Sequence, residues 1–270
     1  MTGAEEAGYS ASFLDVPVPL PRPSATADDR LRELAYLHFS VLLDTQRRLA
    51  SVTGVNIDGA ALLDLPRTGR WELDPRVPAS AQAGPALYSD NDFDRGHLVR
   101  RRDPGWGDAA TARAATEQTF VYTNAAPQVG RFNQGEDLWV GLEDHVLGFA
   151  DAQDLLVSVF TAPVLADGDP MYRGVRIPRR FWKVAAWTSD GALRAAGFVL
   201  DQSDLLDGGS PRAVPSLGGF RTFQAPIGEI GELAGIDFGA LVSADVLVPV
   251  PAAVSPTAWR ELSTTDDIVL

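Results

Sequence analysis

The chain has 270 residues, 45% of them hydrophobic and 22% charged, an ordinary composition for a globular protein that can bury a substantial core without cross-links. It contains no cysteine, which excludes disulfides, zinc–thiolate sites and a cysteine nucleophile. The formal net charge of −13 argues against a broad basic surface of the kind that binds nucleic acid.

The basic residues are concentrated in two stretches, Arg95 to Arg102 and Arg173 to Lys183, and Lys183 is the only lysine in the chain. Net charge governs long-range steering, whereas chemistry depends on the local patch. An acidic body can therefore still carry a cationic groove.

Residues 1–27 contain prolines at 17, 19, 21 and 23 and predict an extended N-terminal arm. The arm has neither the positive start nor the apolar stretch of a secretory signal, and no segment approaches the roughly 18 to 20 apolar residues of a membrane span. We therefore expect a cytoplasmic protein without membrane contact, and export without a leader stays open.

From Asp28 a short helical pattern gives way to alternation, in which Phe39, Val41 and Leu43 share one face of a strand. The polar run at 44–48 predicts a turn, and Leu49 to Ile57 the returning strand. The pattern alone leaves one long helix as an alternative.

Asp94-Arg95-Gly96-His97 ends a predicted strand, Phe93 to Leu98, and places one of three histidines among arginines. Arginine fits phosphate oxygens and depresses the pKa of a nearby imidazole, which stays neutral and able to accept a proton. These properties suit a general base that acts on water beside a phosphodiester. The structural alternative is a histidine that closes a surface turn. Trp106, in the loop that follows, is expected to be a core plug rather than a stacking surface for a base.

The next elements are a short helix at Thr111–Gln118, a strand at Thr119–Thr123 and a turn at Asn124–Gln128. A helix beginning at Asn133 would then bury the row Leu138, Leu142 and Val146. On that helix Asn133 and Glu143 differ by roughly 80° around the axis, so both can point to a common side.

Further on, Asp154–Val164 predicts a buried strand, and a hairpin with an Asp190-Gly191 turn joins Phe181–Thr188 to Ala192–Leu200. A helix starts at Pro226 and ends at Gly235. Residues 28–252 are expected to form a single domain, followed by a C-terminal tail at 253–270 that is either acidic and loose or a strap.

Four motifs occur in order: DRGH at 94–97, TNAAPQ at 123–128, FNQG at 132–135 and WVGLED at 139–144. In this order and spacing they resemble the DNA/RNA non-specific endonucleases, a ββα-metal family that includes endonuclease G and secreted bacterial nucleases. The resemblance implies an α+β fold with a mainly antiparallel central sheet flanked by helices, and it favours the hairpin at 39–57. It also implies phosphodiester hydrolysis with Mg²⁺, or with Mn²⁺ or another divalent cation.

Carried over to this sequence, the resemblance makes His97 the general base and Asn133 the metal ligand. Glu143 would orient water around the ion, Arg95 would neutralise the phosphoryl oxygens, and Asn124 would position His97 or the substrate. Two arginines, Arg70 and Arg131, are assigned to substrate binding.

The chain departs from the family pattern at two places. Glu136 and Asp137 are inserted before Trp139, so Glu136 competes with Glu143 for the acidic role. Leu147 stands where some relatives have a phosphate-binding arginine, which puts substrate affinity in doubt more than the chemistry.

The expected function is a metal-dependent endonuclease acting on DNA and/or RNA with little sequence specificity. A phosphodiesterase for small nucleotides or other diesters, and an inactive scaffold that binds nucleic acid or protein, are the alternatives. Formation of a homodimer and restraint by an inhibitor protein are left open. His38 and His145 are expected to be structural.

Overall fold

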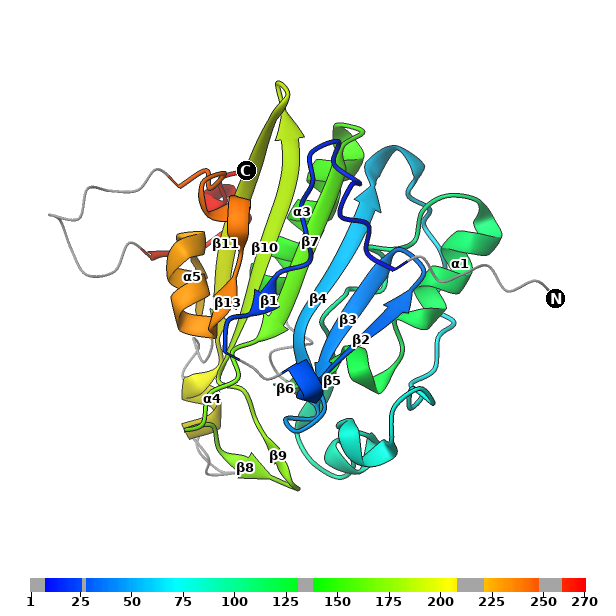
Figure 1. Cartoon of the computed structure of the whole chain (residues 1–270), viewed down its shortest axis with the longest axis vertical. Helices are drawn as coiled ribbons and strands as arrows, with labels where there is room; N and C mark the ends of the chain where they lie inside the picture. The colour runs from blue at the N-terminus through cyan, green and yellow to red at the C-terminus, as the bar shows by residue number, and fades with distance from the viewer. Residues whose placement is uncertain (1–7, 26–27, 131–137, 208–220, 248–258) are drawn as a thin grey trace, which may run out of the picture.

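The computed structural model describes residues 8–25, 28–130, 138–207, 221–247 and 259–270. In these residues an antiparallel sheet of eight strands forms the centre, in the order β14-β12-β11-β10-β7-β4-β3-β2 (Figure 1). Its strands are β2 (Leu31–Tyr36), β3 (Phe39–Asp44), β4 (Leu49–Asp58), β7 (Leu156–Pro163), β10 (Arg180–Ser189), β11 (Ala192–Asp201), β12 (Arg221–Gln224) and β14 (Arg260–Glu261). This sheet with its flanking helices confirms the α+β prediction.

Three two-stranded pairs accompany the central sheet: β1 (Arg22–Pro23) with β13 (Ile236–Asp237), β5 (Phe93–His97) with β6 (Ala125–Val129), and β8 (Met171–Tyr172) with β9 (Val175–Arg176). The α-helices are α1 (Ala109–Gln118), α3 (Leu138–Ala152), α4 (Ser203–Asp207) and α5 (Ile227–Ala234). Short 3-10 turns are η1 (Asp28–Arg30), η2 (Gly59–Ala61), η3 (Ala79–Ala81), η4 (Pro85–Leu87), η5 (Tyr122–Asn124), η6 (Gly239–Val242) and η7 (Thr265–Asp267). Within the described ranges, none of the helices has the length and apolar character needed to cross a bilayer.

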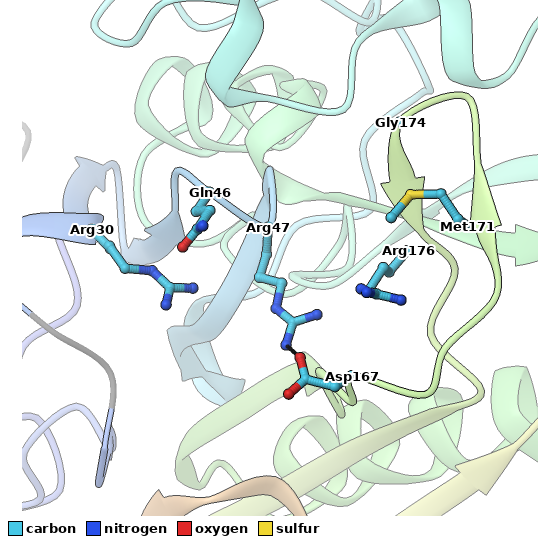
Figure 2. Close-up of a pocket in the computed structure, with 7 residues that line it drawn as sticks. All are labelled: Arg30, Gln46, Arg47, Asp167, Met171, Gly174 and Arg176. Atoms are coloured by element: carbon cyan, nitrogen blue, oxygen red, sulfur yellow. Dashed lines mark hydrogen bonds and ion pairs between the residues drawn. The ribbon is translucent and has the colours of Figure 1, made fainter.

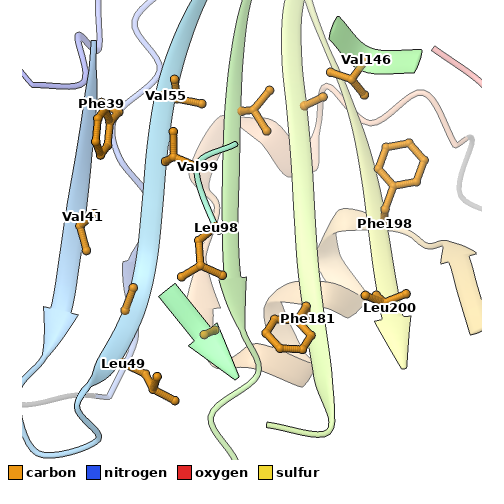
Figure 3. Packing of buried hydrophobic residues seen from close by; sticks show 14 of the residues in the cluster. Phe39, Val41, Leu49, Val55, Leu98, Val99, Val146, Phe181, Phe198 and Leu200 are labelled. Atoms are coloured by element: carbon orange, nitrogen blue, oxygen red, sulfur yellow. The ribbon is translucent and has the colours of Figure 1, made fainter. Parts of the chain in front are cut away.

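One face of the sheet, which we call the α3 face, is covered by α3 and by the β5–β6 pair. Alternate residues of the strands point to it, and Phe39, Val41 and Leu43 are buried there as predicted. Leu98 and Val99, directly after β5, pack on the same face (Figure 3). The segment that carries His97 is thus anchored to the sheet by its next two residues.

The opposite face, the α5 face, is covered by α5 and by the N-terminal segment, which crosses the strands in Figure 1. Leu14 is 1% and Val18 3% exposed, and both belong to the same hydrophobic cluster as Phe160 and Trp182. After turns at residues 11–16, the prolines at 17, 19, 21 and 23 keep the chain extended. Strand β1 then pairs with β13.

Two sequence predictions about local structure were wrong. Residues 31–36 form strand β2 instead of a helix, because the chain reverses at Leu37-His38 and pairs β2 with β3. His38 adopts φ 66°, and its ring stacks on Trp106 with 3.5 Å between ring centroids. The turn therefore depends on a contact between residues far apart in the sequence.

The other error concerns the segment after α1. The predicted strand 119–123 is largely irregular and ends in η5, whereas the predicted turn 124–128 is mostly strand β6, which pairs with β5. Asn124 and Pro127 suggested a turn, but a proline is tolerated in an edge strand. The Gln202 side chain, instead of another strand, bonds the Pro127 carbonyl oxygen and the Val129 N–H, at 3.4 and 3.1 Å.

The described part of the C-terminal segment packs on the domain. Strand β14 pairs with β12, Leu262 is 2% exposed, and the Gln224 side chain exchanges hydrogen bonds of 2.8 and 3.1 Å with the Val269 backbone. Turn η7 lies against α3, where the Thr265 methyl group faces Gly141. This segment acts as a strap over the sheet edge and the start of α3.

Replacement of Leu14 by alanine tests whether the N-terminal segment is part of the core. Leu14→Ala should lower the free energy of unfolding by about 2 to 4 kcal/mol, because it leaves a cavity against the α5 face. Leu73→Ala, the same change at a side chain that is 38% exposed, should cost about 0.5 kcal/mol. Urea denaturation at neutral pH measures both, and equal losses would show that the segment contributes no core.

Candidate active site

Strands β5 and β6 join two of the sequence motifs. Their register pairs Asp94 with Gln128 and His97 with Ala125, so DRGH and TNAAPQ lie side by side. Gly96 leaves room for the Gln128 side chain, with which a Cβ at this position would collide. The glycine and the glutamine of the two motifs are therefore one packing unit.

Asn124 holds the backbone of the two residues that follow His97. Its backbone oxygen accepts from Leu98 N at 3.0 Å, and its Oδ1 accepts from Val99 N at 2.8 Å. Its Nδ2 donates to the carbonyl oxygens of Val99 and Thr119, at 2.9 and 3.0 Å. The side chain is fully buried, so its contacts are those of a residue that positions the His97 segment.

The imidazole of His97 lies against aromatic rings. Ring centroids are 4.5 Å away for Trp71 and 4.8 Å for Phe120, the latter edge-on. The residue keeps some solvent exposure, but its Nε2 is enclosed and has no hydrogen-bond partner among the described residues. A buried nitrogen without a partner costs stability, and such atoms often mark where a ligand or water is bound.

Burial and nearby arginines lower the pKa of His97 to about 3. Burial is the largest cause, followed by the charges of Arg67, Arg101 and Arg100. Because each of these favours the uncharged ring, His97 is neutral at physiological pH. The sequence predicted this state from the neighbouring arginines but did not anticipate the aromatic enclosure.

The arginines near His97 are only partly those expected. Arg95 is exposed, with its guanidinium 5.9 Å from the Trp71 ring centroid. Arg67 stands 5.3 Å from the Phe120 centroid and contributes the largest charge effect on His97, whereas exposed Arg70 is not among the contributors. Sequence reasoning overlooked Arg67, although Arg67 and Arg70 lie in the same loop.

The arginines at 100–102 place several positive charges close together. Burial and the charges of Arg102 and Arg67 lower the pKa of Arg101, whose Nη1 donates to the Leu65 carbonyl oxygen at 2.7 Å. Bringing an anion to this group would relieve the repulsion.

Glu143 is on α3 with a side chain that is 11% exposed. Its Oε2 is 3.7 Å from Arg100 Nε, and its Oε1 is 3.4 Å from Lys183 Nζ. Burial raises the pKa of neighbouring Asp103 to about 6, against the opposing charges of Lys183 and Arg100. Arg100 therefore links the His97 loop to the acidic residue of α3, and Lys183 and Asp103 are site neighbours that the sequence did not reveal.

Three sequence assignments, Asn133, Arg131 and Glu136, lie outside the described residues. In the described part of the chain, no group of three or more histidine, aspartate or glutamate side chains is arranged to hold a metal ion. The assignment of Asn133 as metal ligand stays a prediction.

Leu147 is buried in the core and also lines a cavity of about 480 Å³ beside the 100–107 loop. The charged residues of this cavity are Asp64, Asp144, Asp151 and Arg102. An apolar leucine among mostly acidic residues provides no favourable contact for a phosphate group in this cavity.

A separate pocket of about 370 Å³ contains Arg30, Arg47 and Arg176 (Figure 2). Arg47 pairs with Asp167 at 2.5 Å, Arg30 with Asp44 at 2.6 Å, and Arg176 donates to the Asp169 carbonyl oxygen. Each guanidinium already has an oxygen partner, and no lining residue is shared with the surroundings of His97. The candidate site is therefore the region of His97, Arg100 and Glu143.

Comparison with known proteins identifies the family of the chain. The family model described as DNA/RNA non-specific endonuclease matches residues 19–245. The chain belongs to the DNA/RNA non-specific endonuclease family. The match spans both β5 and α3, which carry His97 and Glu143.

Relatives of this endonuclease-family chain include nucleases from distant organisms. Nuclease C1 of Cunninghamella echinulata is 27% identical over 79% of this chain and 83% of its own length. Human mitochondrial endonuclease G is 28% identical over 61% of this chain and 54% of its own length. The uncharacterized protein y4fB of Sinorhizobium fredii is 40% identical over 97% of this chain, which spans 42% of that protein's length.

A solved structure titled as the EndoG/EndoGI complex, which addresses EndoG inhibition, is similar in fold. The TM-score is 0.59 at 19% identity, and the match covers 76% of this chain and 84% of that chain. The likeness agrees with the ββα-metal fold expected from the motifs.

The low pKa of His97 predicts an acid sensitivity that a non-titrating variant would lack. Between a folded pKa of about 3 and an unfolded value of about 6.5, the unfolded chain binds more protons, so stability falls as the pH drops below 6.5. From pH 7 to pH 5, His97→Gln should lose about 1 to 2 kcal/mol less stability than the wild type. Urea denaturation at both pH values measures this difference; equal losses would mean that the folded imidazole titrates normally.

Proposed function

We propose that the chain is a metal-dependent endonuclease that hydrolyses phosphodiester bonds of DNA and/or RNA with little sequence specificity. The observation that carries the proposal is the neutral imidazole of His97. Its Nε2 is enclosed, has no hydrogen-bond partner among the described residues and lies near the charges of Arg67, Arg100 and Arg101. An imidazole kept unprotonated among cations can accept a proton next to a phosphodiester, whereas it is a poor partner for a cationic or apolar substrate.

His97 is the proposed general base. It takes a proton from a water molecule that attacks phosphorus, and the nearby arginine charges oppose the imidazolium that forms. The neutral ring is restored when the imidazolium passes this proton to solvent, and the departing oxygen takes up a proton from solvent water. Asn124 supports this step indirectly, because it holds the backbone of Leu98 and Val99 directly after the histidine.

An amide and a carboxylate, the predicted donors of Asn133 and Glu143, are of the type that suits a hard divalent cation. Glu143 offers a carboxylate whose two ion pairs, at 3.4 and 3.7 Å, are longer than short hydrogen bonds and leave lone pairs available. Asn133 would hold the ion through its amide oxygen, and Glu143 would accept hydrogen bonds from the surrounding water. When bound, the ion would neutralise charge on the phosphoryl group and on the departing oxygen.

Substrate contact is proposed for the arginines that surround His97. Arg67 and Arg95 are exposed and lie near the aromatic rings of Phe120 and Trp71, so a phosphate can reach both. Such contacts go to the sugar–phosphate backbone, which carries no base sequence. Arg70 and Arg131 remain predicted substrate residues.

His97→Ala should abolish divalent-ion-dependent cleavage of plasmid DNA and of RNA, with a loss of about 100-fold or more, because the general base is removed. Gel assays with and without EDTA measure cleavage, and anisotropy of a labelled oligonucleotide should show that binding persists. His145→Ala is the matched control and should retain activity. Wild-type rates in His97→Ala would refute the assignment.

The same assay separates the proposed activity from its alternatives. A wild-type protein that cuts a chromogenic diester but neither plasmid nor RNA would be a small-diester phosphodiesterase. Nucleic-acid binding without any cleavage would identify an inactive scaffold.

The positions of two arginines predict different kinetic effects. Arg67→Ala should lower kcat/KM on DNA by about tenfold, since it removes a charge-assisted phosphate contact beside His97. Arg70 lies in the same loop, but its charge is not among those that act on His97. Arg70→Ala should therefore lower kcat/KM by less than about threefold. Steady-state kinetics on one oligonucleotide compares them, and a larger loss in Arg70→Ala would return the substrate role to Arg70.

A further inference from the structure

A row of polar residues crosses the otherwise apolar α3 face. Thr53 on β4 is paired in register with Thr161 on β7, which is paired with Lys183 on β10. All three are buried, and Lys183 is 1% exposed. Phe181 and Ala185, two positions to either side of Lys183, belong to the hydrophobic cluster of this face. Lys183 therefore points from the middle of the sheet towards α3.

The ammonium group of Lys183 has defined oxygen partners. Nζ donates to Thr161 Oγ1 at 2.9 Å and lies 3.4 Å from Glu143 Oε1. A buried ammonium is stable only when paired and hydrogen-bonded. Here the sheet supplies the hydroxyl group and α3 supplies the carboxylate.

Glu143 receives a second cation from the loop that follows His97. Arg100 Nε is 3.7 Å from Oε2, while Arg100 Nη2 donates to Asp144 at 2.6 Å. Buried Asp103 is a further acid close enough for Lys183, Arg100 and Glu143 to act on it. The carboxylate of Glu143 thus lies between Lys183 of β10 and Arg100 of the loop after β5.

We propose that Lys183 is a positioning residue for the divalent ion: its ammonium group, fixed by Thr161, holds the Glu143 carboxylate in the orientation that supports the ion's hydration shell. This inference rests on the proposed function. The side chain connects the central sheet to α3, through Thr161 at 2.9 Å and Glu143 at 3.4 Å. Residues that orient a metal's surroundings typically change its affinity by about 10- to 100-fold when replaced.

Mn²⁺ binding to the full chain without nucleic acid tests the proposal, with free Mn²⁺ followed by electron paramagnetic resonance. Lys183→Met should raise the dissociation constant about tenfold or more, as should Glu143→Gln. The double variant should bind within about twofold of Glu143→Gln alone, because Lys183 acts through Glu143. Arg180→Met, which removes a cation from the same strand but one paired with Asp201, should stay within about twofold of the wild type.

A purely structural role would lower the unfolding temperature of Lys183→Met but leave Mn²⁺ affinity unchanged in the folded protein. Affinity within twofold of the wild type, or additive losses in the double variant, would overturn the inference. If Lys183→Met does not fold, Thr161→Val is measured instead. The proposal predicts that Thr161→Val weakens Mn²⁺ binding about threefold in the wild-type background and has no effect in the Glu143→Gln background. An unchanged Mn²⁺ affinity in Thr161→Val would refute the proposal. A wild-type chain that binds no Mn²⁺ would overturn the proposed function itself, and the inference with it.

Discussion

One buried ammonium group constrains the arrangement of the candidate site. Lys183 rises from the centre of a hydrophobic sheet face, where an unpaired charge would be strongly destabilising. Thr161 and Glu143 satisfy it, and Glu143 in turn contacts Arg100 near the end of the His97 segment. The sheet, α3 and the loop after β5 are therefore joined by charge as well as by packing, which fixes α3 and the His97 loop relative to one another.

The site contains two different electrostatic environments, one around His97 and one around Glu143. Around His97, aromatic rings and arginine charges both favour the neutral imidazole. Around Glu143, cations face acids, so the buried charges largely compensate one another. A chain with a net charge of −13 therefore still gathers arginine charges around His97. The acidic residues line the neighbouring cavity beside Leu147 instead.

Local pattern predicted the regular elements whose stability is local. The β10–β11 hairpin and helix α5 with Gly235 in the left-handed conformation follow from alternation, turn residues and helix-end signals. For the β3–β4 hairpin the pattern left one long helix as an alternative, and the family resemblance favoured the hairpin that the structure has. Strands β2 and β6 did not, because each exists through pairing: β2 needs the turn that His38 closes against Trp106, and β6 needs β5, far back in the chain. Propensity gives way to such contacts where the partner is distant.

The sequence by itself determined the family and fold class, through four motifs in order, and it singled out His97 and Glu143. It also implied a neutral imidazole, since arginines adjoin the histidine in the chain itself. Only the tertiary structure decided that Arg67 acts on His97 more than Arg70 does, that Asn124 is occupied by backbone contacts, and that Lys183 faces Glu143. The reason is physical: these relations depend on strand register and on which way each side chain points across the sheet, and neither is encoded in the spacing along one segment.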